Sequence, residues 1–328
     1  MRTFALMKDY RYVWMLLSIL LCASSCAAEN EENGRSQIPQ NEQHVYSTTY
    51  HILVLGDSFS RDAFSYVPGV LEDLLPDVSI DMEILYLGGK GLKYHLDYLS
   101  NDLSQFTLDE YVSADHRWYS SYGISGKDVV RSKQWDLVIM QEGSITIRSY
   151  DNTLPHIVEI SNYIRQWQPS AIFAFMLSPA KPEGSPAIGD YTSDEVWQLN
   201  MTTAKTLLDN EKVDYVIPCG TAIQNARQTY IDDRGDFGHL SYDGDHLQEG
   251  LPCLIEAYVA AEFFLRLKEV NASVATSNLR ITQKWVNQEA IPGKHGAVIE
   301  GSEEEYIICK NSAFLALEHP YEIIKPNY

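Results

Sequence analysis

Five short apolar segments recur along the chain and predict the strands of a buried sheet. The segments are Ile52–Leu55, Met82–Leu87, Leu137–Met140, Ile172–Leu177 and Tyr215–Ile217. Their apolar residues run continuously instead of alternating with polar ones, which is the pattern of strands that are covered on both faces. We therefore expect these strands to lie in the centre of the protein.

The segments between the predicted strands have helical spacing. Residues 152–167 place three isoleucines on one stripe, and residues 192–211 begin with the capping box Thr-Ser-Asp-Glu. Residues 249–268 carry a further apolar stripe. Strands that alternate with helices predict a parallel sheet with helices on both faces, which is an α/β architecture.

Three polar or glycine positions follow directly after predicted strands. Ser58, Gly88 and Gln141 each stand just past the end of an apolar segment. In parallel sheets that are covered on both faces, ligands bind at the carboxyl ends of the strands. These three residues are therefore expected at one edge of the sheet, where the chemistry of such folds takes place.

The first 26 residues resemble a bacterial lipoprotein signal. Basic residues precede an apolar stretch that is short for a membrane span, and small residues then lead to Cys26. We expect lipidation at Cys26 and a place in the bacterial cell envelope; cleavage by ordinary signal peptidase and an uncleaved anchor are the alternatives. Residues 27–48 are polar and predict a flexible tether, and residues 49–328 are expected to form a single domain.

An aromatic-rich insertion separates two of the predicted strands. Residues 98–134 contain six tyrosine, tryptophan and phenylalanine side chains, among them Trp118. Long insertions often serve as binding loops or lids, so these rings are candidates for stacking on sugars. The alternative is that they pack the insertion onto the domain. At the other end, residues 270–328 form an extension with a final helix over 302–318.

Composition narrows the classes of partner. The chain of 328 residues is 45% apolar and 21% charged, as in ordinary globular proteins, and its net charge is −20. Such a surface disfavours binding to nucleic acid and to anionic lipid. The acidic segment 232–245 has neither the spacing of a calcium loop nor a histidine pair for zinc. We expect no metal and no cofactor. Cys219, Cys253 and Cys309 are expected as buried thiols, with one disulfide as the alternative.

Two segments far apart in the chain carry the elements of a serine nucleophile. Ser58 lies in Gly56-Asp57-Ser58, where a strand ends and a helix begins, so that backbone N–H groups can face a developing oxyanion. A helix N-cap is the alternative role for such a serine. Asp243-x-x-His246 supplies a base and a carboxylate that orients it, which a serine nucleophile requires.

In this order, the motifs resemble those of the SGNH, or GDSL-like, serine hydrolases. That superfamily has four blocks that contribute Ser, Gly, Asn and His, and Ser58, the G-x-x-G of Gly88 to Gly91, and His246 match three of them. The resemblance covers about residues 50–268. It implies a flavodoxin-like three-layer α/β/α sandwich around a five-stranded parallel sheet.

The third block departs from the pattern, because Gln141 stands where the superfamily has Asn. The glutamine side chain also offers an NH₂ donor but is one methylene longer. This departure, together with the segment Gly220 to Arg227, resembles an uncharacterised bacterial lipoprotein branch of the superfamily. The resemblance to that branch implies no particular substrate.

The resemblance implies a Ser58, His246 and Asp243 triad, with an oxyanion hole formed by the N–H groups of Ser58 and Gly88 and by the Gln141 amide. Additional candidates for substrate contact are Asp57, Gly91, His95 and Trp118. His95 has an alternative as an ordinary helix-surface residue. Arg227 is expected to pair with an acid within the fold rather than with substrate.

We therefore expect a lipid-anchored serine esterase that acts on an O-acyl ester, in the first instance an acetyl group on a carbohydrate. Export and the aromatic insertion favour glycans over lipids. One alternative is a lipase-like or thioesterase-like hydrolase of the same fold. The other is a glycan-binding lipoprotein that keeps the fold without catalysis, which the Asn-to-Gln departure allows.

Overall fold

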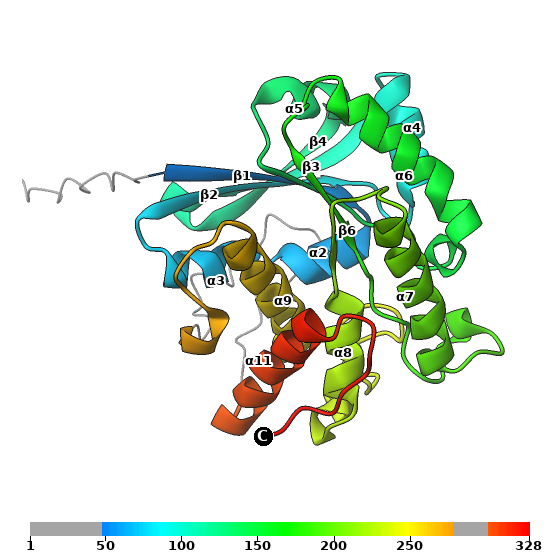
Figure 1. The fold of residues 1–328 in the computed structure, drawn as a ribbon, viewed down its shortest axis with the longest axis vertical. Helices are drawn as coiled ribbons and strands as arrows, with labels where there is room; N and C mark the ends of the chain where they lie inside the picture. Colours follow the sequence, from blue (N-terminus) through cyan, green and yellow to red (C-terminus); the bar gives the residue numbers. More distant parts are fainter. Residues whose placement is uncertain (1–47, 279–300) are drawn as a thin grey trace, which may run out of the picture. The chain divides into compact units, whose positions relative to one another are not determined.

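A seven-stranded sheet runs through the protein (Figure 1). The computed structural model describes residues 48–278 and 301–328, which fall within one compact unit, 44–328. The strands are β1 (Thr48–Gly56), β2 (Val78–Tyr86), β3 (Ser104–Val112), β4 (Arg117–Ser125), β5 (Leu137–Met140), β6 (Ile172–Met176) and β7 (Tyr215–Ile217). Their order across the sheet is β4-β3-β2-β1-β5-β6-β7.

The five predicted strands form the parallel part of the sheet, as expected. β1 pairs in parallel with β2 and β5, and β5, β6 and β7 continue in parallel. The order of these five strands is that of the flavodoxin-like fold, with β1 at the point where the chain reverses direction across the sheet. The α/β fold class is therefore confirmed.

The strand count differs from the prediction because the aromatic insertion is itself a hairpin. β3 pairs antiparallel with β2 and with β4, which adds two strands to one edge of the sheet. Trp118 on β4 is 1% exposed, and its indole Nε1 donates to the carbonyl of Ser65 at 2.9 Å. Its ring packs the hairpin onto the domain, so the structure contradicts Trp118 as a substrate contact.

Helices cover both faces of the sheet (Figure 1). They are α2 (Ser58–Phe64), α3 (Val67–Leu74), α4 (Leu92–Ser100), α5 (Gly126–Ser132), α6 (Tyr150–Arg165), α7 (Ser193–Asp209), α8 (Cys219–Arg227), α9 (Leu251–Leu267) and α11 (Glu303–Glu318). Alternate residues of β1 enter two separate cores: Ile52 and Val54 pack with α2, α3, α8, α9 and α11, and Leu53 and Leu55 pack with α4 to α7. A strand buried in this way on both faces explains the continuous apolar run.

Local sequence signals fix the helix ends. The capping box predicted for α7 is present, since the Thr192 side chain accepts from the Glu195 N–H and the Glu195 carboxylate accepts in return. Ser302 and Glu305 form a second capping box at α11, the expected final helix. The three cysteines of the described residues are buried free thiols.

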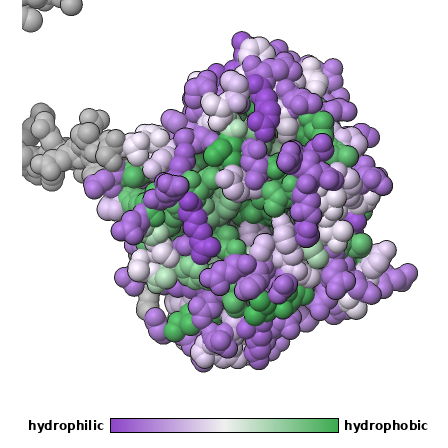
Figure 2. Space-filling model, viewed as in Figure 1, coloured by the Kyte–Doolittle hydropathy of each residue, from purple (hydrophilic) through white to green (hydrophobic). Residues whose placement is uncertain are grey.

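The predicted signal, Cys26 and most of the tether lie outside the described residues. Over residues 48–278 and 301–328, the helices are all too short or too polar to cross a membrane. Figure 2 shows a surface that is hydrophilic over much of the visible face, with hydrophobic side chains showing between the polar ones.

Candidate active site

Ser58 is the first residue of α2, immediately beyond the carboxyl end of β1. Asp57 caps the helix, because its Oδ1 accepts from the Phe59 N–H at 3.1 Å. Gly56 is required by a close approach: a Cβ there would lie 1.9 Å from Ser60 Oγ and 2.5 Å from Gln141 Oε1. The tight turn thus places the Ser58 hydroxyl at the edge of the sheet, with its N–H at a helix N-terminus.

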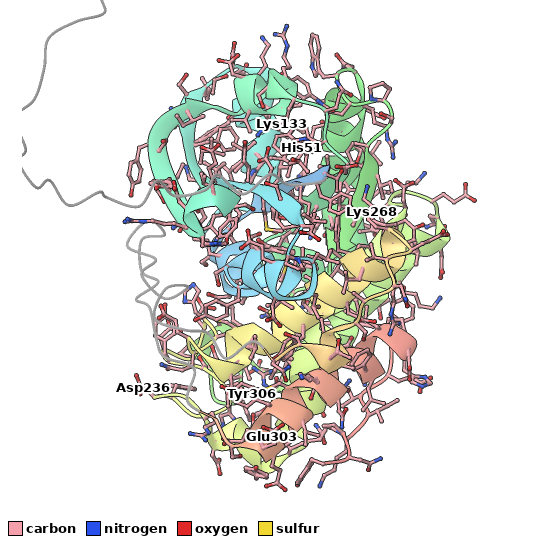
Figure 3. All side chains as sticks on the ribbon, turned by 90° about the vertical axis from the view of Figure 1, so that its left-hand side faces the viewer. His51, Lys133, Asp236, Lys268, Glu303 and Tyr306 are labelled. Atoms are coloured by element: carbon pink, nitrogen blue, oxygen red, sulfur yellow. The ribbon has the colours of Figure 1, made fainter. Side chains whose placement is uncertain are left out.

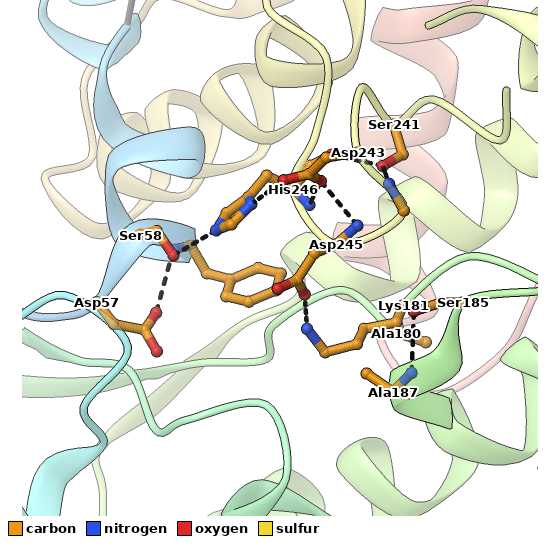
Figure 4. Close-up of polar contacts among 12 residues, drawn as sticks. Asp57, Ser58, Ala180, Lys181, Ser185, Ala187, Ser241, Asp243, Asp245 and His246 are labelled. Atoms are coloured by element: carbon orange, nitrogen blue, oxygen red, sulfur yellow. Dashed lines mark hydrogen bonds and ion pairs between the residues drawn. The ribbon is translucent and has the colours of Figure 1, made fainter. Parts of the chain in front are cut away.

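The structure brings the three predicted triad residues into one hydrogen-bonded line (Figure 4). Ser58 Oγ lies 2.7 Å from His246 Nε2, although the two residues are 188 positions apart in the chain. On the other side of the ring, His246 Nδ1 lies 2.8 Å from Asp243 Oδ2. Burial opposes ionisation of Asp243, but hydrogen bonds from the backbone and ring of His246 outweigh it and lower its pKa. An ionised Asp243 is suited to hold a histidine base in orientation.

A network of backbone contacts holds the turn that carries His246. Asp243 Oδ1 accepts from the N–H groups of Asp245 at 2.8 Å and His246 at 2.7 Å. Ser241 Oγ accepts from the Gly244 N–H at 2.9 Å and donates to the His246 carbonyl at 2.7 Å. Gly244 has φ 80°, a conformation that favours glycine. His246 and Asp243 are therefore held in place by contacts within the turn itself.

Two backbone N–H groups follow the neighbouring strands β1 and β2. Ser58 follows β1 and Gly88 follows β2, the strand that pairs with β1 along its whole length. Over the described part of the chain, neither of these N–H groups donates a hydrogen bond to another protein group. Gly88 is also exposed to solvent. Both N–H groups are therefore left without an acceptor among the described residues.

Gln141 does not fill the expected role of an oxyanion donor. Its side chain is fully buried at the end of β5, where Oε1 accepts from the Asp57 N–H at 2.8 Å and from Ser60 Oγ at 3.1 Å. Its Nε2 donates to the Glu142 carbonyl at 2.5 Å. The extra methylene lets the amide reach under the nucleophile loop and brace it, which corrects the expectation drawn from its position in the sequence.

Glu142 is a second bracing residue, which sequence analysis missed. Its buried Oε1 accepts from the Leu92 N–H at 3.0 Å and the Gly143 N–H at 2.8 Å. A Cβ on Gly91 would lie 2.0 Å from that oxygen. Gly91 is therefore a point of close approach between the loop after β2 and the end of β5, rather than the substrate contact that was expected.

His95 is buried beneath the loop that precedes Ser58, near the backbone of Gly56. Its ring is fully buried and packs against Phe106, with the ring centres 5.5 Å apart. Burial lowers its pKa to about 3, so the ring is neutral in ordinary solutions. The structure thus contradicts both expectations for His95, substrate contact and a place on the helix surface.

Asp57 and Lys181 place buried charge beside the triad. Asp57 was expected to contact substrate but is 5% exposed, and burial raises its pKa to about 6. Lys181, in the loop after β6, forms an ion pair with Asp245 (Figure 4), and its Nζ lies 5.2 Å from the centre of the Phe59 ring. Burial lowers the pKa of Lys181 to about 8. No motif in the sequence marked Lys181.

Arg227 supports the loop that carries Lys181. Its Nη1 donates to the Ala180 carbonyl at 3.1 Å and to Ser193 Oγ at 3.0 Å, and its Nε lies 3.9 Å from Asp232 Oδ1. These are contacts within the fold, as expected for Arg227. Across residues 48–278 and 301–328, no three His, Cys, Asp or Glu side chains are grouped as ligands of a metal ion.

Comparison with known sequences identifies a family. The family model described as "Domain of unknown function (DUF4886)" matches residues 51–278. No curated protein matches the chain.

Comparison with solved structures finds relatives of the fold. A DUF4886 family protein from Bacteroides uniformis is 19% identical, with a TM-score of 0.69 over 84% of this chain and 98% of its own. A candidate SGNH hydrolase from Slackia heliotrinireducens is 17% identical, with a TM-score of 0.46 over 66% and 99%. Est24, a carbohydrate acetylesterase from Sinorhizobium meliloti, is 14% identical, with a TM-score of 0.38 over 66% and 99%. The first of these likenesses shows a shared fold.

Proposed function

The chain belongs to the DUF4886 family, and we propose that it is a serine esterase that removes an O-acyl group, most simply acetyl, from a carbohydrate. The observation that carries the proposal is the line from Ser58 Oγ to His246 Nε2 at 2.7 Å and from His246 Nδ1 to Asp243 Oδ2 at 2.8 Å. Hydroxyl, imidazole and carboxylate in that order are the arrangement that activates a serine.

In the proposed reaction, Ser58 Oγ attacks the acyl carbon while His246 accepts the hydroxyl proton. The resulting oxyanion is bound by the N–H groups of Ser58 and Gly88. The bond to the sugar oxygen then breaks, and His246 returns the proton to the departing alcohol. Water, deprotonated by His246, attacks the acyl-enzyme and releases the carboxylic acid and Ser58. Asp243 stabilises the imidazolium in both halves.

The choice of substrate rests on the net charge of the protein and on its expected location in the cell. The net charge of −20 disfavours polyanionic substrates. We further propose that the chain is exported and anchored through a lipid on Cys26, which would bring the domain to glycans of the cell envelope or its surroundings. A lipase-like or thioesterase-like activity is the alternative within the same chemistry.

A glycan-binding protein without turnover is the second candidate. The observation in its favour is that Gln141 directs its amide inward, which leaves two backbone donors for the oxyanion. Removing one donor typically slows an acyl-transfer enzyme about 10²–10³-fold, so a slow enzyme and a binding protein differ by measurable turnover.

Release of p-nitrophenol from its acetate ester by purified residues 27–328 tests the proposal. We expect turnover by the unaltered domain and none above background with Ser58→Ala, while Ser60→Ala, two residues away, retains a nucleophile and measurable activity. A folded wild-type domain that hydrolyses neither this ester nor longer-chain esters contradicts the proposal. A preference for long acyl chains favours the lipase alternative.

A further inference from the structure

The loop that carries the catalytic histidine also exposes two large aromatic rings. Phe237 is 41% exposed and Tyr242 is 42% exposed. Between them, Leu240 is fully buried and Ser241 is 1% exposed. The two rings are therefore not left outside by a loose loop but are held outward by a fixed one.

Each of the two rings contacts the turn of residues 243–246, which carries Asp243 and His246. Tyr242 stacks on His246, with ring centres 5.7 Å apart and an angle of 18° between the planes. The Phe237 ring lies against Gly244, between Asp243 and Asp245, since a Cβ on Gly244 would be 3.0 Å from Phe237 Cζ. Both rings thus stand beside the residues that act on the ester bond.

The backbone between the two rings is strained. His239 has φ 54° and Leu240 has φ 62°, which residues with a side chain rarely adopt. The strain is held by a hydrogen bond from the Phe237 N–H to the Ser241 carbonyl at 2.9 Å and by His239 Nδ1, which lies 2.8 Å from Asp232 Oδ2. Strained backbone of this kind persists where the surroundings impose it and often marks functional sites.

The chemistry around the rings fits a neutral sugar. A pyranose ring offers C–H groups to an aromatic face and hydroxyl donors to acceptors at its edge, and carboxylates are acceptors. Asp236 precedes Phe237 in the chain and is exposed, so its carboxylate can accept such a hydrogen bond, whereas Asp243 and Asp245 are engaged with His246 and Lys181. The carboxylates disfavour an anionic ligand, whereas the rings favour a ligand with an apolar face.

We propose that Phe237 and Tyr242 form a platform for the sugar ring whose ester Ser58 attacks. The platform assigns the leaving alcohol to a neutral pyranose and places it on the histidine side of the site, where His246 protonates the departing oxygen. This inference rests on the proposed esterase function. It also moves the sugar-stacking role from Trp118, which is buried in the hairpin, to the loop of the catalytic base.

The test compares a sugar ester with an ester that has no ring. Acetate release from acetylated xylo-oligosaccharide and from ethyl acetate is measured for wild type, Phe237→Ala, Tyr242→Ala and the double variant. Tyr242→Phe keeps the ring, and Tyr122→Ala removes a tyrosine that is 67% exposed on β4. We expect the double variant to lose roughly tenfold or more of kcat/KM on the saccharide relative to ethyl acetate. Tyr122→Ala is expected to behave like wild type. Tyr242→Phe keeps the ring but loses the hydroxyl that hydrogen-bonds to Asp243, so we expect it to keep the wild-type ratio of kcat/KM on the two esters.

A binding measurement separates the platform from catalysis. In the Ser58→Ala background, calorimetric titration with the acetylated oligosaccharide should show binding that Phe237→Ala and Tyr242→Ala weaken together. Three results would overturn the platform. The first is an equal loss of kcat/KM on both esters, and the second is binding that the platform substitutions leave unchanged. The third is the absence of binding to the folded Ser58→Ala protein. If wild type hydrolyses none of the esters but still binds the oligosaccharide in a way that depends on Phe237 and Tyr242, the esterase function is wrong and the platform stands.

Discussion

Two of the histidine–aspartate pairs in the described part of the chain invite comparison: one involves a residue inside β1, and the other lies beyond the carboxyl end of β1, where its ring meets a hydroxyl group. In the first pair, His51 Nδ1 lies 2.8 Å from Asp81 Oδ2. In the second, His246 Nδ1 lies 2.8 Å from Asp243 Oδ2 and its Nε2 lies 2.7 Å from Ser58 Oγ. The distance between imidazole and carboxylate is therefore the same in both pairs and cannot by itself identify a catalytic site.

The surroundings of the two pairs distinguish them. Lys133 Nζ lies 2.7 Å from Asp81 and 2.6 Å from Glu83, so the carboxylate beside His51 is shared with a permanent cation (Figure 3). His51 thus belongs to a charge network that ties the sheet to its flanking segments. At the Ser58 end, the second ring nitrogen faces the Ser58 hydroxyl beside a helix N-terminus. The comparison teaches that the third group, rather than the pair, distinguishes the proposed catalytic site.

The largest expected effect comes from removing each histidine in turn. His246→Ala removes the base, and we expect ester hydrolysis to fall by about 10³-fold or more. His51→Ala removes a partly exposed ring and should leave kcat/KM within about twofold, with at most about 1 kcal/mol lost in stability. Steady-state hydrolysis of p-nitrophenyl acetate by both variants checks this. Similar losses in the two variants would contradict the assignment of the site.

Substitution of Asp243 should lower kcat, whereas substitution of Asp81 should not. Asp243→Asn keeps the shape of the side chain but removes the charge that stabilises the imidazolium, and we expect a loss of about 10²–10⁴-fold in kcat. Asp81→Asn, the matched change in the other pair, should leave kcat unaltered. The measurement is kcat at saturating substrate, with circular dichroism of both variants as the control for folding. An Asp243→Asn enzyme with wild-type kcat would remove Asp243 from the triad.

Buried acids near the two pairs also differ in their partners. Glu83 has Lys133 beside it, whereas Asp57 accepts from the Phe59 N–H, and burial raises the pKa of Asp57 from 3.8 to about 6. The folded state then binds this proton more tightly than the unfolded chain does. Stability therefore falls as pH rises from about 4 to about 6, by up to about 3 kcal/mol from this group.

Asp57→Asn keeps a side-chain oxygen for the helix cap and removes the charge. We expect the variant to be more stable than wild type at pH 8, and the difference to nearly vanish at pH 4. Urea unfolding at the two pH values measures the free energies. A difference of equal size at both pH values would show that ionisation of Asp57 is not its cause.

A smaller effect is expected at Gln141 and distinguishes bracing from oxyanion binding. Gln141→Ala leaves the Asp57 N–H and the Ser60 hydroxyl without their buried acceptor, which destabilises a protein by about 1–3 kcal/mol. We expect that loss in urea unfolding, with kcat reduced by less than about tenfold at a temperature where the variant is folded. An unchanged unfolding free energy with kcat lowered about 10²–10³-fold would restore the oxyanion role.

Sequence patterns predicted the parallel sheet because its strands are apolar along their whole length. The sequence also predicted that Ser58, His246 and Asp243 act together, because they stand in two short motifs that follow one another in the order found in serine hydrolases. The hairpin of β3 and β4 was not predicted because its strands contain polar residues that are buried in the structure. Asp109 on β3 is fully buried and pairs with Arg61 Nε at 2.7 Å, and a carboxylate in an apolar segment makes a strand look like a loop.

The residues that were misassigned share a physical cause. Gln141 and His95 were assigned from their positions after a strand and on a helix, but neither position tells which way the side chain points. One methylene turns the Gln141 amide under the nucleophile loop, and the His95 ring faces Phe106 in the core. Long-range contacts decide such directions, and Lys181 was missed for the same reason.

Covalent labelling tests the central claim most directly. The folded domain is incubated with a fluorophosphonate, and the adduct is located by mass spectrometry of peptides. We predict one adduct, on Ser58, that is lost in Ser58→Ala, strongly slowed in His246→Ala and formed at the wild-type rate in His51→Ala. An unlabelled Ser58 in folded wild-type protein, or labelling that His246→Ala does not slow, would contradict the account.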